Sequence, residues 1–195
     1  MASDGKTRCW GYKDPLARAY HDDEWGVPVH DDQVLYEFIL LEGVQAGLSW
    51  STVLKRRENY RRAFDGFDPA KVAGYTEARI DELVQDASII RNRRKIVSHV
   101  DNAKAFLKVQ EEHGSFDDYL WAHVDHTPVM NEFTSWKQVS SETDLSRQIS
   151  KDLKSLGFSF VGPTIIYAYM QSVGIVNDHL TSCFRWQEIK ERYGG

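Results

Sequence analysis

The sequence has few cysteines and no long apolar run. Uninterrupted runs of aliphatic and phenylalanine residues reach only four, at 38–41, far too short to span a membrane. The opening residues MASDGKTRCW contain no apolar signal region, so we expect a protein of the cytoplasm. In an unexported chain of 195 residues, the only two cysteines, Cys9 and Cys183, are expected to be reduced thiols or metal ligands rather than a disulfide.

Strand patterns are also lacking, as are internal repeats and low-complexity tracts. No segment alternates convincingly between apolar and polar residues, whereas apolar residues recur with helical spacing through much of the chain. We therefore predict an all-α fold in a single domain spanning 1–195. The predicted helices cover 31–47, 49–64, 76–87, 92–114, 115–124 and 143–157. Ser49 and Thr76 are expected N-caps, Gly114 and Gly157 are expected ends, and 125–142 is expected to be a loop.

The net charge of −5 is unfavourable for a nucleic-acid-binding protein, but the charge is unevenly distributed. Residues 51–108 hold thirteen Lys and Arg against eight Asp and Glu, with dense basic clusters at 54–62 and 91–95. One interpretation is a local positive face that attracts a polyanion. The other is an ordinary solvated helix surface, in which these arginines pair with Glu58, Glu82 and Asp86. The sequence alone does not choose between them.

The stretch LKSLGFSFVGPTIIYAYMQSVG, which begins at residue 153, contains a turn with two glycines. Gly157 and Gly162 lie between two predicted helices, and Pro163 suits the first position of the second helix. The unpaired backbone donors at such a helix start can bind a phosphate without reading base sequence. The pattern is typical of a helix-hairpin-helix, here about 144–174. The alternative is a plain helical corner, with Phe158, Phe160 and Val161 packed into the core.

Histidine and cysteine stand four residues apart near the end of the chain, as His179 and Cys183. On a helix, that spacing would place both side chains on one face. Cys9 and His21, at the other end of the sequence, would complete four ligands if the fold brought the ends together. Spacing alone leaves open whether these residues form one site.

Aromatic residues are concentrated in the first fifty positions, and Glu42 stands alone in the apolar stretch FILLEGVQAGLSW. A buried carboxylate surrounded by aromatic rings can bind a flat cationic ligand by stacking, cation–π attraction and charge pairing. The alternative is that the aromatics form core and that Glu42 caps a helix or forms an ion pair. The aromatic residues in question are Trp10, Tyr12, Tyr20, Trp25 and Trp50.

Several long blocks together resemble the type I 3-methyladenine-DNA glycosylases of bacteria. These are YHDDEWGVP, LEGVQAGLSWSTVLKRRENYRRAFDGFDPAKVA, IIRNRRKI, GFSFVGPTIIYAYMQSVGIVNDH and the closing cysteine, and they run from about Cys9 to Cys183. The resemblance implies a helix-hairpin-helix glycosylase fold whose termini are fastened by a structural zinc. Its ligands would lie at 9–21 and 179–183. They are Cys9, His21, His179 and Cys183.

The same resemblance assigns roles to the remaining candidates. Glu42 would be the catalytic and base-binding glutamate, within an aromatic cage formed by Trp10, Tyr20 and Trp50.

The resemblance also assigns DNA contacts. Leu48 would fill the gap that an extruded base leaves in the duplex, and Gly157 and Gly162 would contact DNA. One departure is Ala17, where relatives carry a tyrosine; this puts part of the cage in question unless Tyr12 replaces it.

The implied activity is release of free 3-methyladenine from double-stranded alkylated DNA by a monomeric enzyme. The wider superfamily often places an Asp two residues before a His after the hairpin, but VNDH has Asn177 there, with Asp178 shifted by one. We therefore expect no nucleophile-activating Asp, no Schiff-base lysine and no strand cleavage. Two other functions stay open. One is a non-catalytic helix-hairpin-helix module, and the other is a zinc hydrolase acting on a small substrate.

Overall fold

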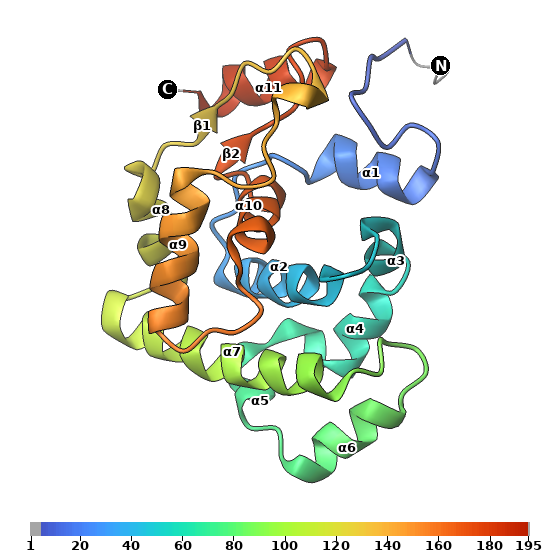
Figure 1. The fold of residues 1–195 in the computed structure, drawn as a ribbon, viewed down its shortest axis with the longest axis vertical. Coiled ribbons are helices and arrows are strands. Elements are labelled where there is room, and N and C mark those ends of the chain that lie inside the picture. The colour runs from blue at the N-terminus through green and yellow to red at the C-terminus, as the bar shows by residue number, and fades with distance from the viewer. Residues whose placement is uncertain (1–4, 195) are drawn as a thin grey trace.

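The described part of the chain, residues 5–194 of the computed structural model, is mostly helical, which confirms the all-α class (Figure 1). The α-helices are α1 (Pro15–Asp23), α2 (Asp32–Gln45), α3 (Trp50–Leu54), α4 (Arg57–Ala63), α5 (Pro69–Ala73), α6 (Glu77–Gln85), α7 (Arg93–His113), α8 (Phe116–Trp121), α9 (Asp144–Ser155), α10 (Pro163–Ser172) and α11 (Phe184–Tyr193). Short 3₁₀ helices are η1 (Asp65–Phe67), η2 (Ala122–Val124) and η3 (Trp136–Gln138), and the strands are β1 (Val129–Met130) and β2 (Val176–Asn177). Within residues 5–194, no helix is both long and apolar enough to cross a membrane.

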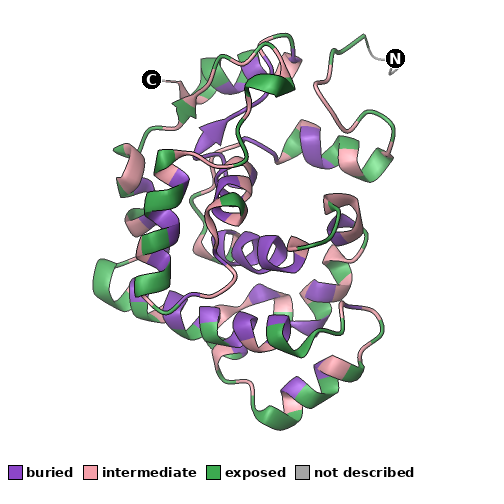
Figure 2. Ribbon diagram, viewed as in Figure 1, coloured by how far each residue is buried: buried purple, intermediate pink, exposed green. Residues whose placement is uncertain are grey.

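Helix α2 forms the centre of the fold. Asp31 caps its start by accepting from Val34 N at 3.0 Å, and every residue from Leu35 to Val44 is buried. A helix that is buried around its whole circumference needs neighbours on all sides. It packs against α7, α8, α10 and α3, and Figures 1 and 2 show it in the middle of the molecule with its buried surface enclosed. This position makes its C-terminal end a rigid support for side chains.

The predicted capping residues have the expected roles. Ser49 Oγ accepts from Thr52 N and Thr76 Oγ1 accepts from Arg79 N, each at 3.3 Å. Gly114, with a φ of 89°, follows the last residue of α7. That left-handed conformation favours glycine, so this glycine ends the helix.

The single helix predicted over 49–64 is divided into α3 and α4. The backbone of Arg56 has φ −109° and ψ −1°, outside ideal helical values, and its N–H donates to Val53 O in a tighter turn. No proline or glycine marks the break, so the sequence pattern did not predict it. After it, α4 directs Arg57 toward Glu37, with Nε and Oε1 2.6 Å apart.

The segment 125–142 is not simply a loop, because it contains β1 and η3. Val129 N donates to Ile175 O at 2.9 Å and Asn131 N donates to Asn177 O at 3.2 Å, which makes β1 and β2 a parallel pair. A pairing of two residues is too short to produce visible alternation in a sequence. It ties this segment to the chain that follows α10.

Three short helices were not predicted: α1, α5 and α11. Two of them carry recognisable start signals, since Asp14 and Asp68 cap helices whose first residues are Pro15 and Pro69. Five to ten residues give too little periodicity to identify such helices from apolar spacing. In Figure 1, α1 and α11 lie at the same end of the molecule, so segments from opposite ends of the sequence lie near each other.

Candidate functional site

A cluster of two cysteines and two histidines joins the beginning and end of the chain. Cys9 precedes α1, His21 lies on α1, His179 follows β2, and Cys183 caps α11. Their ligand atoms all lie within 4.8 Å of one another, and all but Cys9 are fully buried. Each sulfur lies 3.4 Å from His21 Nε2 and 3.5 Å from His179 Nδ1. This arrangement can hold a metal ion.

The second nitrogen of each histidine ring faces an oxygen. His21 Nδ1 lies 2.8 Å from Asp22 Oδ1, and His179 Nε2 lies 2.9 Å from Trp25 O. Such contacts fix the tautomer and leave the other nitrogen's lone pair available to a metal. Burial also lowers the pKa of His179, which favours the neutral, ligating form.

His179 and Cys183 do not share a helix, which was the condition under which their spacing would place both side chains on one face. These residues lie in a turn, where Cys183 N donates to Leu180 O at 2.7 Å, and α11 begins only at Phe184. The two side chains converge because the turn folds toward α1. The four residues nevertheless form one cluster, as predicted.

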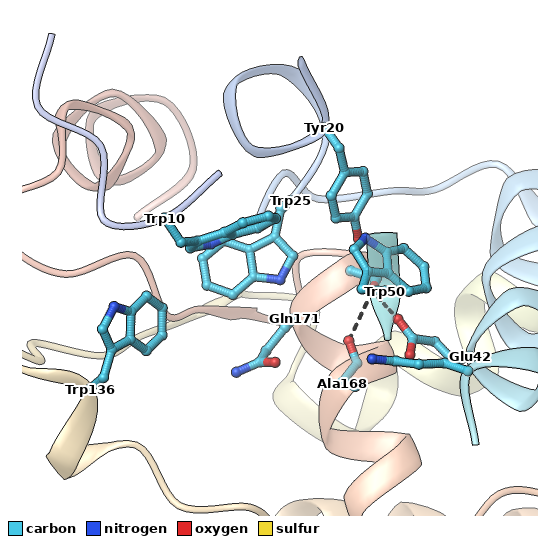
Figure 3. A pocket seen from close by; sticks show the side chains of 10 residues that line it. Trp10, Tyr20, Trp25, Glu42, Trp50, Trp136, Ala168 and Gln171 are labelled. Carbon is cyan, nitrogen blue, oxygen red and sulfur yellow. Dashed lines mark hydrogen bonds between the residues drawn. The ribbon is translucent and has the colours of Figure 1, made fainter. Parts of the chain in front are cut away.

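A cavity of about 340 Å³ opens beside this cluster, between α1, the C-terminal end of α2 and α10. Its walls are mainly aromatic, and Figure 3 shows these rings around a shared space. Trp10 and Trp25 meet edge to face with ring centroids 5.3 Å apart, and Tyr20 and Trp50 lie 5.2 Å apart. The lining residues are Trp10, Tyr20, Trp25, Glu42, Gln45, Trp50, Trp136, Ala168, Gln171 and Ser172.

Glu42 projects into this cavity from the last turns of α2 and is only 3% exposed. Its Oε1 accepts from Ser172 Oγ at 2.5 Å, whereas its Oε2 is buried and has no hydrogen-bond partner among the described residues. Burial raises the pKa of Glu42 to about 8, although the Ser172 hydrogen bond opposes the rise. The predicted desolvation of this carboxyl is thus confirmed. This carboxyl therefore lines a ligand-sized cavity with one oxygen unpaired.

Two further polar atoms at the cavity have no partner within residues 5–194. These are the hydroxyl of Tyr20 and Nε1 of Trp50, both buried. Buried polar atoms in native proteins are almost always hydrogen-bonded. Together with Glu42 Oε2, they indicate a cavity built to receive a ligand with polar edges rather than a purely apolar one.

The structure brings Trp10, Tyr20, Glu42 and Trp50 together as the sequence predicts, but not Tyr12. Tyr12 is 56% exposed and does not line the cavity, so in this structure it does not take the place of the missing tyrosine at Ala17. Trp25 was noted among the aromatics without an assigned role, and it forms part of the wall.

Gln171, Ser172 and Trp136 also line the cavity but were not predicted as site residues. Trp136 belongs to the aperiodic segment 125–142, and its Nε1 donates to Cys9 O at 3.1 Å. The only signal for it was an isolated tryptophan in a polar segment. Gln171 and Ser172 follow a helical period, and nothing in the sequence distinguishes them from residues that pack in a core.

Leu48 lies at the mouth of the cavity, in the turn between α2 and α3. Its side chain is 37% exposed, and its neighbours Gln45 and Trp50 both line the cavity. Leu48 N donates to Gln45 O at 2.6 Å, which closes the turn. Leu48 is thus an exposed apolar side chain on a tight turn between two residues that line the cavity.

The hairpin consists of α9 and α10, as predicted. Gly157 has a φ of 97°, whereas Gly162 has an ordinary φ of −62° and precedes Pro163. No side chain caps the start of α10, so its first backbone donors stay available. Phe158 and Val161 are buried, as the alternative reading of this segment expects. The turn therefore packs into the core and presents donors at the same time.

The two basic clusters have different environments. In the first, Arg57 pairs with Glu24 and Glu37 at 2.7 and 2.6 Å, and Arg61 also reaches Glu37, at 2.9 Å. Arg56 donates to a backbone carbonyl, that of Ser88, at 3.2 Å. These contacts hold the cluster against α2, so most of its charge stabilises the fold.

In the second cluster, Arg93 pairs with Glu77 and Asp81, but the exposed Arg91 and Arg94 have no ion-pair partner among the described residues. Arg94 lines a surface hollow shared with Ser159 and Phe160 of the hairpin turn. This cluster therefore lies beside the hairpin turn that precedes α10.

Two of the three acidic residues named in the solvated-surface interpretation form ion pairs with arginines. Glu58 pairs with Arg61 at 3.2 Å and Glu82 with Arg79 at 3.0 Å, whereas Asp86 accepts from Ser88 N at 2.8 Å. The two interpretations therefore each describe a part of the basic region.

Asn177 and Asp178 are fully buried and do not line the cavity. Asp178 accepts from Asn131 Nδ2, Tyr167 OH and Gln171 Nε2 at 2.6, 2.5 and 2.7 Å. Its two oxygens are thus occupied by protein donors.

Comparisons with known proteins agree with this architecture. A family model of methyladenine glycosylases matches residues 10–186. DNA-3-methyladenine glycosylase 1 of Escherichia coli K12 is 50% identical over 177 residues, which are 90% of this chain and 95% of that protein. A crystal structure of 3-methyladenine DNA glycosylase I superposes with a TM-score of 0.89 at 48% identity, covering 91% of this chain and 98% of that chain.

Another similar structure is a variant of 3-methyladenine DNA glycosylase I in complex with 3-methyladenine. It has a TM-score of 0.87 and 37% identity, and covers 88% of this chain and 92% of that chain. With matches of this extent in both sequence and fold, the chain belongs to the methyladenine glycosylase family.

Proposed function

We propose that this protein extrudes 3-methyladenine from double-stranded alkylated DNA and hydrolyses its N-glycosidic bond. The observation that carries the proposal is Glu42, a buried carboxyl with one unpaired oxygen in an aromatic cavity. Methylation at N3 makes the adenine of a nucleotide cationic, and a cation between aromatic rings and a carboxylate is favoured over neutral adenine. A damaged base is also cheaper to extrude than an intact pair. The lesion is therefore selected in two ways, by its positive charge in the cavity and by the lower cost of extruding it from the duplex.

The roles follow from the geometry. The base stacks among the rings of Trp10, Tyr20 and Trp50. Glu42 accepts hydrogen bonds from the edge of the base, and its negative charge attracts the positive charge of the base. The bond between the sugar C1′ and the base breaks with its electron pair going to the base, which leaves neutral. A water oxygen then bonds to C1′ and loses a proton. Because the leaving group is already activated, this chemistry needs no lysine nucleophile and produces no strand cleavage.

The pKa of Glu42 couples base binding to pH. At neutral pH, a carboxyl with a pKa of about 8 is mostly protonated in the free protein. A cationic base favours the ionised form, so binding releases a proton. We expect the apparent affinity for a cationic base to rise with pH up to about 8 and to level off above it.

DNA contact is proposed for three elements. Leu48 enters the gap left by the extruded base, and the turn between Gly157 and Gly162 presents the donors of α10 to a phosphate. Arg91 and Arg94, which have no ion-pair partner among the described residues, add a positive surface beside that turn. Phosphate contacts of this kind bind DNA without reading its sequence.

The Cys9, His21, His179 and Cys183 cluster is proposed to hold a structural zinc ion. A tetrahedral zinc with Zn–S of about 2.3 Å and Zn–N of about 2.0–2.1 Å places sulfur and nitrogen about 3.6 Å apart, close to the 3.4–3.5 Å found here. Four protein ligands leave no position for an activating water. Zinc would thus fasten the N- and C-terminal segments, while the excision chemistry belongs to the cavity.

We further propose one glycosylase domain over 1–195, with the helix-hairpin-helix at about 144–174. It would work as a monomer on chromosomal DNA in the bacterial cytoplasm.

The test is to incubate the protein with methylated duplex DNA, identify released bases by mass, and examine the strands before and after alkali. We expect free 3-methyladenine, with breaks appearing only after alkali. Binding to duplex with no base released would instead support a non-catalytic helix-hairpin-helix module. Replacing the native metal should leave base release intact; a change in the rate constant that tracks metal identity would support the zinc hydrolase alternative.

A further inference from the structure

Two glutamines line the cavity, and a hydrogen bond fixes the orientation of the side-chain amide of one of them, Gln171. It projects from α10, and Figure 3 shows its side chain among the cavity residues, between Trp25 and Ala168 in that view. Its Nε2 donates to Asp178 Oδ2 at 2.7 Å. The same oxygen accepts from Tyr167 OH at 2.5 Å, and Asp178 Oδ1 accepts from Asn131 at 2.6 Å. Asp178 is thus an acceptor for three donors at once.

This arrangement determines which end of the amide faces the cavity. A carboxylate has only acceptors, so the amide of Gln171 must turn its N–H₂ group toward Asp178. Its Oε1 then points the other way and accepts no hydrogen bond from the described residues. A flip of the amide would place two acceptors, Oε1 and Asp178 Oδ2, against each other.

The neighbouring polar groups do not offer the same function. Ser172 Oγ lies 2.5 Å from Glu42 Oε1 and 2.9 Å from Ala168 O, so its single proton is already committed. Gln45 has no hydrogen bond that would hold its amide in one orientation. Gln171 therefore adds a second acceptor, besides Glu42, with a direction that the protein imposes.

We propose that Gln171 Oε1 discriminates between methylated adenine and methylated guanine. This deepens, and rests on, the proposed base excision. Adenine carries an amino donor at position 6, whereas guanine carries a carbonyl acceptor there. An imposed acceptor hydrogen-bonds the first and opposes the second. A site built around a buried polar group rejects the analogue that cannot pair with it more strongly than an apolar pocket could.

The experiment compares wild type with Gln171→Met on duplex DNA that carries both 3-methyladenine and 3-methylguanine. Methionine has similar length and no acceptor of comparable strength. The ratio of released 3-methylguanine to 3-methyladenine should rise about tenfold, because the variant loses roughly the free energy of one hydrogen bond that favours adenine. An unchanged ratio overturns the proposal. If wild type releases neither base, the proposed function itself has failed, which is a separate outcome.

Two matched variants separate selectivity from folding. Gln171→Glu keeps an acceptor toward the cavity when its carboxyl is protonated and donates to Asp178 Oδ2 in place of the amide, so at a pH at which it is protonated the wild-type ratio should be retained. Tyr167→Phe removes another donor from the same Asp178 oxygen without altering the cavity lining, so it should lower the melting temperature and leave the ratio unchanged. A ratio that follows the melting temperature across all three variants would show a structural role only, and would overturn the proposal.

Quenching of tryptophan fluorescence by the two free bases provides a readout that does not depend on catalysis. Gln171→Met should narrow the difference in affinity between 3-methyladenine and 3-methylguanine by about the same factor. Identical affinity ratios in wild type and variant would contradict the assignment even if the variant excises bases slowly.

Discussion

Replacing Glu42 with glutamine should change the pH dependence of folding in a specific way. The pKa of Glu42 is raised from 4.5 to about 8 by burial. Between these values, the folded state keeps a proton that the unfolded state has lost, so the free energy of unfolding falls as pH rises. With about 1.4 kcal/mol for each pH unit, wild type should lose roughly 4 kcal/mol between pH 5 and pH 8 through this one group. Glutamine does not titrate and removes this component.

The assay is urea unfolding of wild type and Glu42→Gln at several values between pH 5 and pH 9. Other titrating groups are common to both proteins and cancel in the difference. The stability of the variant relative to wild type should increase by roughly 4 kcal/mol from pH 5 to pH 8 and level off above pH 8, because only wild type carries the titrating carboxyl. A difference that does not vary with pH would refute the assignment of a raised pKa to Glu42.

The same variant should lose affinity for free 3-methyladenine. Above pH 8, where Glu42 is ionised, its hydrogen bond to the base is one to a charged acceptor and contributes roughly 1.5–3 kcal/mol, so the dissociation constant should rise by about one to two orders of magnitude. Affinity for undamaged duplex should scarcely change. Glu37→Gln is the matched control, because Glu37 lies on the same helix but pairs with Arg57 and Arg61. It should lower stability and leave base affinity intact; the same pattern in Glu42→Gln would make Glu42 a structural residue.

Three further substitutions test the proposed zinc site, the second basic cluster, and the hydrogen bonds from Lys95 to the end of α2. Cys183→Ser should lower both the bound zinc, measured by elemental mass spectrometry, and the melting temperature; full zinc with an unchanged melting temperature would exclude it as a ligand. Replacing Arg91 and Arg94 with Gln should flatten the salt dependence of duplex binding by up to about 1.8 log units per log unit of salt, whereas Arg57→Gln should mainly lower stability. Lys95→Met should cost about 1–3 kcal/mol, because its ammonium donates at 2.7 and 2.6 Å to two carbonyls at the end of α2; an unchanged urea midpoint would contradict this.

Local patterns in the sequence determined most of the helices and the hairpin. The caps at Ser49 and Thr76 and the stop at Gly114 depend on contacts within a few residues, so they can be read from the chain directly. The chain has only two cysteines, which suggested the Cys part of the cluster, whereas the choice of His21 and His179 among seven histidines rested on the family resemblance. The composition of the cluster needed no knowledge of distances.

Tertiary structure decided how these pieces work together. The turn that aims His179 and Cys183 at a common point is held by contacts with distant segments, at Thr7, Trp25 and Phe133. Which basic cluster stabilises the fold and which faces outward depended on where Glu37 lies. The amide direction of Gln171 depends on Asp178, and through it on a strand pair that no periodicity reveals. Each of these is a long-range contact between polar groups, and such contacts leave no repeating pattern in a sequence because the partners meet only after the chain has folded.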